Sequence, residues 1–410
     1  MKKINFLFTA IAMAVMISTA ASAQMTADSI MMGAGYAEDV YYSMENGVVQ
    51  TVDRTNWDLG FYTTAWSAGI IINDGAGVEL RLYPGADTNG WNAVDTTGMS
   101  TWPVLYNSTE VWEDGAFNRH AGGHPDYGWG VYNTITHNVV GDSIYLVTLA
   151  DGTVKKLWIV QKRSIENTYE FRYSDLDGSN EMEVTLNCND YSDKNFVYYS
   201  LTTGEVLDRE PVSGSWDILF TKYIAMLEGN VPYPVTGVLN NVNVPANRFE
   251  MVGPDFDDWT AAPMDSTKAP IGYDWKYFDM TQFQYVVEDS MAFFVRNMNK
   301  DVYKLVFTAF DYTEGKAVFE KQMVHASAVP VYSDDSRVIV YPNPASNQIT
   351  LNSLSNREQV RLINVTGQIV AETTASGMVT MDVSGLPEGL YFVSVGSGNN
   401  TLTRKVIIRR

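Results

Sequence analysis

The chain has 410 residues, a net charge of −20 at pH 7 and 45% hydrophobic residues, so it is a folded protein too long for one ordinary core. The negative balance argues against a nucleic-acid partner and against binding to an anionic membrane surface, because both require a basic face. Cys188 is the single cysteine, which excludes an internal disulfide and a cysteine-based metal site.

The N-terminus has the three parts of a secretory signal peptide. Lys2 and Lys3 form a basic start, residues 4–18 are mostly apolar, and Ala21-Ser22-Ala23 has the small residues of a cleavage site. We therefore predict that residues 1–23 are removed during export. No later stretch is apolar over about 18 residues, so no transmembrane helix is expected.

After the signal peptide, the chain predicts antiparallel β-structure. Short apolar or alternating runs, such as Val78–Leu82 and Val302–Phe307, have the length of strands. Turn dipeptides separate such runs, including Asp74-Gly75, Asp151-Gly152 and Asp177-Gly178. Because the sequence lacks long helical periodicity, the expected fold class is all-β.

The sequence contains an internal repeat. Trp57-Asp58 and Trp216-Asp217 each follow a Tyr-Tyr-Ser segment and precede an apolar strand. Further along, residues 145–173 align with residues 293–321 without a gap. The identical pairs in this alignment are Val147 and Val295, Val154 and Val302, Lys156 and Lys304, Leu157 and Leu305, Glu166 and Glu314, and Phe171 and Phe319.

The same order of landmarks in both copies predicts two tandem antiparallel β domains, residues 24–185 and 186–328. Two copies are too few for a solenoid. We interpret the repeated Trp-Asp pair as architectural, because a buried Trp anchors a sheet and an Asp side chain satisfies the backbone of a turn. A catalytic role for the aspartates is the alternative.

A short linker precedes a separate C-terminal domain. Residues 329–337 are mostly small or polar and include Pro330, which is typical of a linker. Residues 338–410 then contain short strand-like segments at regular spacing, which predict an immunoglobulin-like β-sandwich. These segments include residues 338–341, 348–351, 360–363, 390–395 and 405–408.

The C-terminal domain carries four short motifs: Tyr341-Pro342-Asn343-Pro344-Ala345, Leu362–Gly367, Asp382–Tyr391 and the closing Lys405–Arg410. In combination they resemble the type A sorting domain of the type IX secretion system of Bacteroidota. The resemblance implies passage through the periplasm and the outer membrane, recognition by the type IX machinery, and removal of the domain by the sortase of that system. The product is then expected on the outer leaflet of the outer membrane or in the extracellular space.

The two repeats carry landmarks of a second family: Asn56-Trp57-Asp58, Asn73, Phe293–Arg296, Lys304–Phe307 and Asp311-Tyr312. In this order they resemble the HmuY family of haem-binding proteins. The resemblance implies two tandem HmuY-like antiparallel β domains. It also implies haem as the cofactor, held between two histidines, or in some relatives two methionines, on adjacent loops.

By the spacing of that family, the second ligand position falls on Thr134 in the first repeat and on Met280 in the second. Threonine does not ligate haem iron, whereas the soft thioether of methionine does. Met251 occupies the first ligand position, upstream of Trp275. The resemblance therefore implies a Met251–Met280 haem site. The alternative is that both belong to the 18 methionines as ordinary packing residues.

Three of the four histidines, His120, His124 and His137, lie close together in the sequence. Two of them belong to the glycine-rich segment Arg119–Tyr127. Neutral imidazole is a common ligand of metal and haem iron, so the three histidines are further candidate haem ligands. The alternative is an exposed loop with ordinary histidines, and no dedicated metal site is predicted.

The remaining motifs do not indicate catalysis. Asp175–Glu181 lacks the spacing of an EF-hand and is interpreted as a hairpin turn. We find no nucleophile–base motif and no glycine loop that would hold a phosphate. The expected function is therefore that of an exported binding protein, not an enzyme. It would capture haem or a related tetrapyrrole, free or from a haem-carrying protein. The alternative is a structural or adhesive surface module that binds a glycan or a protein without haem.

Overall fold

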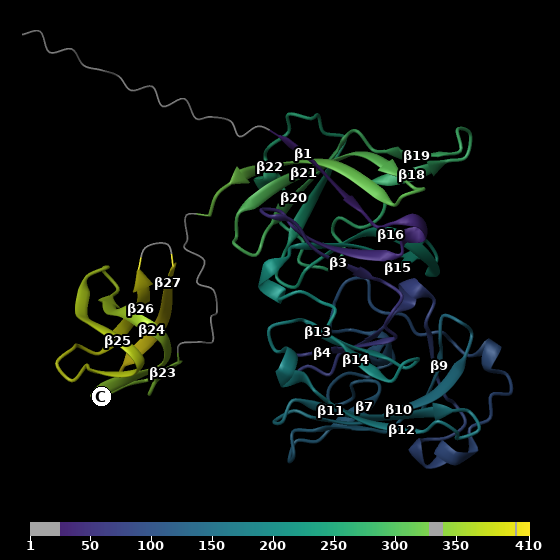
Figure 1. Ribbon diagram of the computed structural model, residues 1–410, viewed down its shortest axis with the longest axis horizontal. Helices are drawn as coiled ribbons and strands as arrows, with labels where there is room; N and C mark the ends of the chain where they lie inside the picture. Colours follow the sequence, from purple (N-terminus) through teal and green to yellow (C-terminus); the bar gives the residue numbers. More distant parts are fainter. Residues whose placement is uncertain (1–24, 328–338, 398–399) are drawn as a thin grey trace, which may run out of the picture. The chain divides into compact units, whose positions relative to one another are not determined.

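A computed structural model describes residues 25–327, 339–397 and 400–410. The predicted signal peptide (1–23) and linker (329–337) lie outside these residues. Contacts divide the chain into two units, residues 1–327 and 328–410 (Figure 1). In the described residues, regular structure consists of antiparallel strands joined by turns and short 3-10 segments, so the expected all-β class is confirmed.

The first sandwich of the larger unit packs two sheets around one core. Its strands are β4 (Leu59–Tyr62), β5 (Ile70–Ile72), β6 (Glu79–Leu82), β7 (Gly130–Tyr132), β8 (Val139–Gly141), β9 (Tyr145–Thr148), β10 (Val154–Arg163), β11 (Thr168–Asp175), β12 (Met182–Asn187), β13 (Phe196–Ser200) and β14 (Glu205–Leu207). One sheet has the order β14-β13-β4-β5; the other has the order β12-β11-β10-β8-β7, with β9 joining β6 to β10. Phe61, Trp129 and Phe171 fill the space between the sheets.

The second sandwich repeats this design. Its strands are β1 (Thr26–Met31), β2 (Glu38–Ser43), β3 (Gly47–Asp53), β15 (Ile218–Leu227), β16 (Val231–Asn240), β17 (Ala246–Glu250), β20 (Met291–Arg296), β21 (Val302–Asp311) and β22 (Lys316–His325), with a ribbon of β18 (Lys276–Asp279) and β19 (Gln284–Val287). The sheets have the orders β1-β22-β21-β20-β17 and β16-β15-β2-β3. Trp275 stacks on Phe307 in the core, with ring centroids 3.8 Å apart.

The two repeats exchange their N-terminal hairpins. β2 of the first repeat pairs with β15 of the second, and β13 of the second repeat pairs with β4 of the first. The first sandwich is therefore continuous over residues 59–207, whereas the second combines residues 26–53 with residues 218–325. The structure thus differs from the predicted division into domains 24–185 and 186–328. There are two cores, but each is built from both copies.

The exchange has a local cause. A short turn connects β11 to β12, and the two strands form one antiparallel ladder. Because consecutive strands pair in this way, the chain carries β13 and β14 onto the first sandwich before the second sandwich begins. The remaining hairpin, β2–β3, then closes the second sandwich, and β1 pairs with β22 (Figure 1).

The two Trp-Asp pairs occupy equivalent corners. Asp58 accepts a hydrogen bond from the Leu201 N–H at 2.7 Å, and Asp217 accepts one from the Met44 N–H at 2.7 Å. Each of these N–H groups belongs to the residue that directly follows an exchanged strand, β13 or β2. The buried carboxylates therefore fix the exchanged hairpins, which agrees with the architectural interpretation of the repeat.

A pair of equivalent asparagine amides completes the corners. Asn73 donates to the carbonyl of Trp57 at 2.9 Å, and Asn241 donates to the carbonyl of Trp216 at 2.8 Å. Both amides are buried. Each corner thus has the same local structure, a Trp-Asp pair with a buried asparagine bound to the Trp carbonyl.

The smaller, C-terminal unit is a single β-sandwich. Its strands are β23 (Ile339–Tyr341), β24 (Gln348–Asn364), β25 (Ile369–Asp382), β26 (Gly389–Ser397) and β27 (Asn400–Ile408). β24 is long and irregular: its first part pairs with β23, and its last part pairs with β26. Leu351, Leu362 and Val393 from these parts share one core, so the bent strand belongs to both layers.

Candidate functional site

The two sandwiches of the larger unit meet through outer sheet faces. In Figure 1, β3, β15 and β16 lie next to β4, β13 and β14. Residues 105–114, which we call the wedge loop, leave the first sandwich and insert Trp112 at this junction. The Trp112 Nε1 donates to the carbonyl of Asn240 at 2.8 Å. The indole also packs against three apolar clusters, which contain Phe196, Tyr223 and Trp216.

A buried ion pair crosses the junction. Arg209 bonds Asp39 at 2.7 Å, and each side chain is only 4% exposed. The Thr221 hydroxyl donates to the same carboxylate at 2.5 Å, and the guanidinium lies over the rings of Trp57 and Tyr198. Because removing two charges from water is costly, these added contacts are what make the buried pair tolerable.

Glu210 is a second buried charge beside this pair. Its carboxylate accepts hydrogen bonds from the N–H groups of Asn195 and Phe196 and from the Tyr198 hydroxyl, at 2.9–3.2 Å. Burial nevertheless raises the pKa of Glu210 to about 7. The junction therefore contains a carboxyl group that changes charge near neutral pH.

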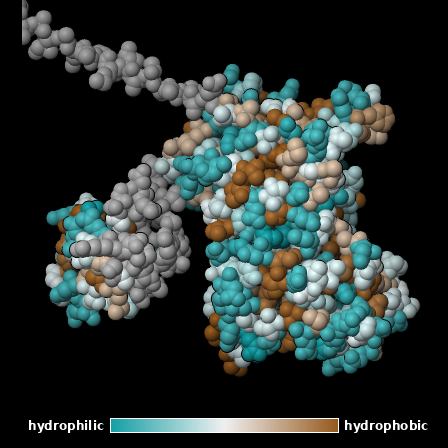
Figure 2. Space-filling model, viewed as in Figure 1, coloured by the Kyte–Doolittle hydropathy of each residue, from teal (hydrophilic) through white to brown (hydrophobic). Residues whose placement is uncertain are grey.

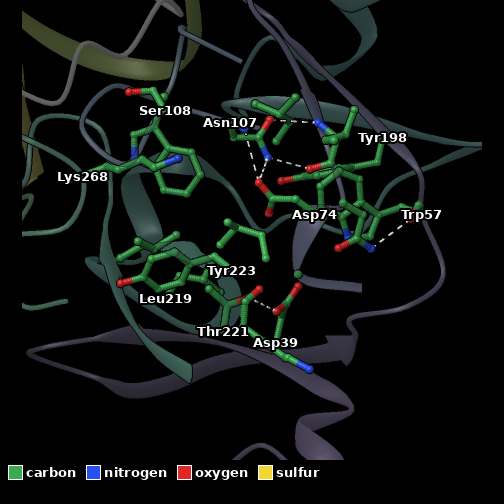
Figure 3. A pocket seen from close by; sticks show the side chains of 18 of the residues that line it. Asp39, Trp57, Asp74, Asn107, Ser108, Tyr198, Leu219, Thr221, Tyr223 and Lys268 are labelled. Carbon is green, nitrogen blue, oxygen red and sulfur yellow. Dashed lines mark hydrogen bonds between the residues drawn. The ribbon is translucent and has the colours of Figure 1, made fainter. Parts of the chain in front are cut away.

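The junction also encloses a small cavity of about 60 Å³. Figure 3 shows Asp74 and Asn107 at one end of it, and Asp39 and Thr221 at the other. Sites for drug-sized ligands measure about 300–1,000 Å³, whereas a space this small holds only a few water molecules. This cavity is too small for haem.

Charged side chains and a closely packed glycine line the cavity. Burial raises the pKa of Asp74 to about 6 and lowers that of Lys268 to about 8. Asn107 donates to Asp74 at 2.9 Å. Gly75 follows Asp74 in the chain and lies against β15 so closely that an added Cβ atom would come 1.8 Å from the carbonyl oxygen of Lys222. Glycine is required here for the sandwiches to touch.

A different surface displays an exposed tryptophan. Trp66 is 66% exposed on the turn of residues 63–68, between β4 and β5. Lys162 donates to the carbonyls of Thr64 and Ser67, at 2.7 and 2.5 Å. Further donors to this turn are Asn167 to the Thr63 carbonyl, Tyr169 to the Ser67 carbonyl, and Trp129 and Asn118 to the Ala68 carbonyl. The turn is therefore held from several elements, although its tip is in solvent.

Next to Trp66 lie two of the predicted histidines. The Trp66 and His137 rings meet edge to face, with centroids 6.3 Å apart. His137 Nδ1 and the Tyr132 hydroxyl are 2.6 Å apart, and the ring of His124 lies 5.5 Å from that of Tyr132. We call Trp66, His124, Tyr132 and His137 the imidazole cluster. It combines apolar ring surface with hydrogen-bonding groups at one end of the first sandwich.

The third predicted histidine has different surroundings. His120 lies 3.2 Å from the Tyr145 hydroxyl through Nε2, and burial lowers the pKa of its imidazole. The structure thus brings His124 and His137 together around Tyr132, and places His120 in a separate, half-buried contact. In the described residues, no three His, Cys, Asp or Glu side chains are grouped to hold a metal ion.

The predicted methionine ligands lie on the surface of the second sandwich. Met251 directly follows β17 and is 90% exposed, and Met280 lies in the turn between β18 and β19 and is 71% exposed. Neither lines the junction cavity. Thr134 lies in the equivalent turn of the first sandwich and is exposed as well. The core-filling alternative for the two methionines is wrong, because both thioethers are in solvent.

Sequence reasoning did not single out Trp66, Tyr132 or the junction charges. A weak signal for Trp66 is its position among small and polar residues, Thr63-Thr64-Ala65 and Ser67, between two apolar strands. Such a segment predicts a turn, and a tryptophan on a turn is solvent-accessible. Asp39 and Arg209 carry no comparable signal, because β2, which contains Asp39, and the segment after β14, which contains Arg209, meet only through the hairpin exchange.

Comparison with known families identifies the C-terminal unit. Residues 339–409 match the family described as "Secretion system C-terminal sorting domain". This unit is a type IX sorting domain. It directs export to the cell surface or the extracellular space, as its motifs predict. In the part of the chain that the structure describes, we find no helix with the length and apolarity needed to span a membrane.

Comparisons of the whole chain are far less informative. No curated protein matches it. PorZ, an essential surface component of the type IX secretion system of Porphyromonas gingivalis, is 11% identical with a TM-score of 0.18, and the match covers 68% of this chain and 44% of PorZ. A biofilm-associated protein BSP domain is 11% identical with a TM-score of 0.15, covering 94% of this chain and 66% of that one. The HmuY resemblance therefore stays a prediction.

Proposed function

We propose that the mature protein is a binding protein of the cell surface or the extracellular space, not an enzyme, and that the imidazole cluster binds a carbohydrate. One observation carries this proposal: Trp66 is exposed at the tip of a turn that buried side chains hold in place. An exposed indole on a rigid turn is a preorganised anchor, so little conformational entropy is lost when a ligand covers it.

The chemistry of the cluster suits a sugar ring. The C–H face of a pyranose is apolar and stacks on an aromatic ring, while its hydroxyl groups need hydrogen-bonding partners at the edge. Trp66 offers the ring, and His137 and Tyr132 offer donors and acceptors beside it. On the face of the larger unit seen in Figure 2, apolar residues are interspersed with hydrophilic ones and do not form one broad patch.

A glycan array with the mature chain, followed by titration calorimetry with the best ligand, tests this proposal. We expect Trp66→Ala to lower the affinity at least about tenfold, as loss of a central aromatic anchor does. Ile165→Ala is the matched control, because Ile165 is exposed on a nearby turn and outside the cluster. An array without hits, or equal losses in both variants, would contradict a carbohydrate site at Trp66.

Haem capture, free or from a haem-carrying protein, is a second candidate. It is favoured by the contact of both the His124 ring and the His137 ring with Tyr132, since imidazole and phenolate are both haem ligands. Titration of haemin into the mature chain, followed in the Soret band, tests it. If the cluster ligates haem, His137→Ala abolishes the shift and the double variant Met251→Ala/Met280→Ala keeps it. The reverse result would assign haem to the methionines, and an unchanged free-haemin spectrum would remove this candidate.

The sorting domain has its own partners. We propose that the type IX machinery recognises residues 339–409 and that its sortase removes them after export. Mass spectrometry of the protein from the cell surface or culture medium checks this. A product that still contains Lys405–Arg410 would contradict removal.

A further inference from the structure

A surface groove of about 380 Å³ lies beside the junction, between the wedge loop and the second sandwich. It shares Trp112 and Lys268 with the inner cavity, but it opens to the outside and is about as large as a small-ligand site. The groove is distinct from the imidazole cluster, because it contains no residue of that cluster.

Three cationic side chains line this groove: Lys268, Arg296 and Lys300. Among the described residues, none of them forms an ion pair. Two carboxylates, Glu110 and Glu113, also line the groove. Three positive and two negative side chains give the lining a net charge of +1, on a chain whose total is −20. The groove is therefore a cationic site on an acidic protein.

Backbone contacts fix the cations. The Lys268 N–H donates to the Glu110 carbonyl at 2.8 Å, which attaches this segment to the wedge loop. Lys268 itself is only 7% exposed and lies over the Trp112 ring at 4.8 Å. Arg296 ends β20, and Lys300 follows in a turn with a left-handed backbone, φ 69°. Lys268 is thus a buried ammonium next to an open groove. It forms no ion pair among the described residues, and the carboxylates of Asp74 and Asp114 act on it only through longer-range attraction.

We propose that this groove binds the oxyanion of a small acidic ligand, a carboxylate or a phosphate or sulfate group. Lys268 supplies the buried charge, and Arg296 and Lys300 supply donors at the rim. Arg offers a planar pair of N–H donors that matches an oxyanion, and a charge-assisted hydrogen bond is about twice as strong as a neutral one. The wall formed by Trp112 gives the rest of the ligand an apolar contact.

Titration calorimetry of the mature chain carrying Trp66→Ala, which removes the anchor of the proposed carbohydrate site, with sodium glucuronate, neutral glucose and inorganic phosphate tests this proposal. We expect glucuronate or phosphate to bind, with an affinity that falls as salt is added, and glucose to bind at least about tenfold more weakly. Glucuronate without phosphate indicates a carboxylated sugar, and binding of both indicates a general oxyanion site. No binding of either anion, or equal binding of glucose, overturns the proposal.

Variants locate the site and separate it from the proposed function. Arg296→Gln/Lys300→Gln should lower the anion affinity about tenfold or more, whereas Arg163→Gln, which removes an exposed positive charge of the same unit outside the groove, should not change it. Trp66→Ala should also leave anion binding unchanged, because Trp66 does not line the groove. An anion affinity unchanged in the double variant would place the site elsewhere and overturn the assignment.

Discussion

The two sandwiches keep the same framework and differ in their loops. Asp58 and Asp217 fix equivalent corners, and Trp129 and Trp275 occupy equivalent core positions. In contrast, the connection from β6 to β7 runs over residues 83–129, whereas the one from β17 to β18 is much shorter. The longer connection supplies the wedge loop and His124. The corners and core positions that hold each sandwich together are thus repeated, while the wedge loop and the imidazole cluster occur in the first copy alone.

Buried lysines show the same relationship at a finer scale. In the first sandwich, Lys162 on β10 binds the carbonyls of Thr64 and Ser67. In the second, Lys276 on β18 binds the Thr236 carbonyl at 2.6 Å. Both lysines hold the strand pair that follows the Trp-Asp corner, but they come from different strands. Both sandwiches therefore use a buried lysine as hydrogen-bond donor, but the lysine stands at a different position in each repeat.

The substitution with the largest expected effect on stability lies at the junction, where the two sandwiches contact each other. Arg209→Met leaves Asp39 buried without its partner, so we expect the free energy of unfolding to fall by about 3–5 kcal/mol. Urea unfolding followed by tryptophan fluorescence measures this. Arg163→Met is the control, since it removes an exposed pair with Glu170 and should cost less than about 1 kcal/mol. Equal costs would show that the buried pair does not stabilise the junction.

The corners allow a direct test of equivalence. Asp58→Ala leaves the Leu201 N–H without its acceptor, and we expect it to cost about 2 kcal/mol. Asp217 accepts a second backbone N–H, from Met298 at 2.8 Å, so Asp217→Ala should cost about 3 kcal/mol.

The same denaturation curves measure both corner variants, with Asp151→Ala on an exposed turn as the reference substitution. The comparison of the two copies fails if either corner variant is as stable as this reference. A greater loss of stability in the Asp217 variant than in the Asp58 variant would sharpen the comparison, because Asp217 accepts from two backbone N–H groups.

A smaller effect should appear in the pH dependence of stability. The pKa of Glu210 is about 7 in the folded chain, against an ordinary value of 4.5. Between these values the unfolded chain loses the proton and the folded chain keeps it, so this group makes stability fall as pH rises. From pH 5 to pH 8 the wild type should lose about 2–3 kcal/mol more than Glu210→Gln. Parallel pH profiles of the two proteins would contradict a buried, proton-binding Glu210.

Much of the architecture could be predicted from the sequence, because it depends on local patterns. Strand periodicity, the repeated Trp-Asp pair and the C-terminal motifs all indicate features that the structure contains. The hairpin exchange could not be predicted, since Tyr41-Tyr42-Ser43 and Tyr198-Tyr199-Ser200 fit either sheet equally well. The exposure of Met251 and Met280 also depends on where the turns point, which spacing along the chain does not specify.

The pairing of β1 with β22 has a consequence for the order in which the protein matures. A chain that emerges N-terminus first can complete the first sandwich once β14 is available. The β2–β3 hairpin waits for β15, and β1 waits for β22, the last strand of the larger unit. Thr26 pairs with Lys321, which precedes the sorting domain in the sequence. A chain truncated before β22 lacks the partner of β1, so the sheet β1-β22-β21-β20-β17 is complete only when Lys316–His325 has been made.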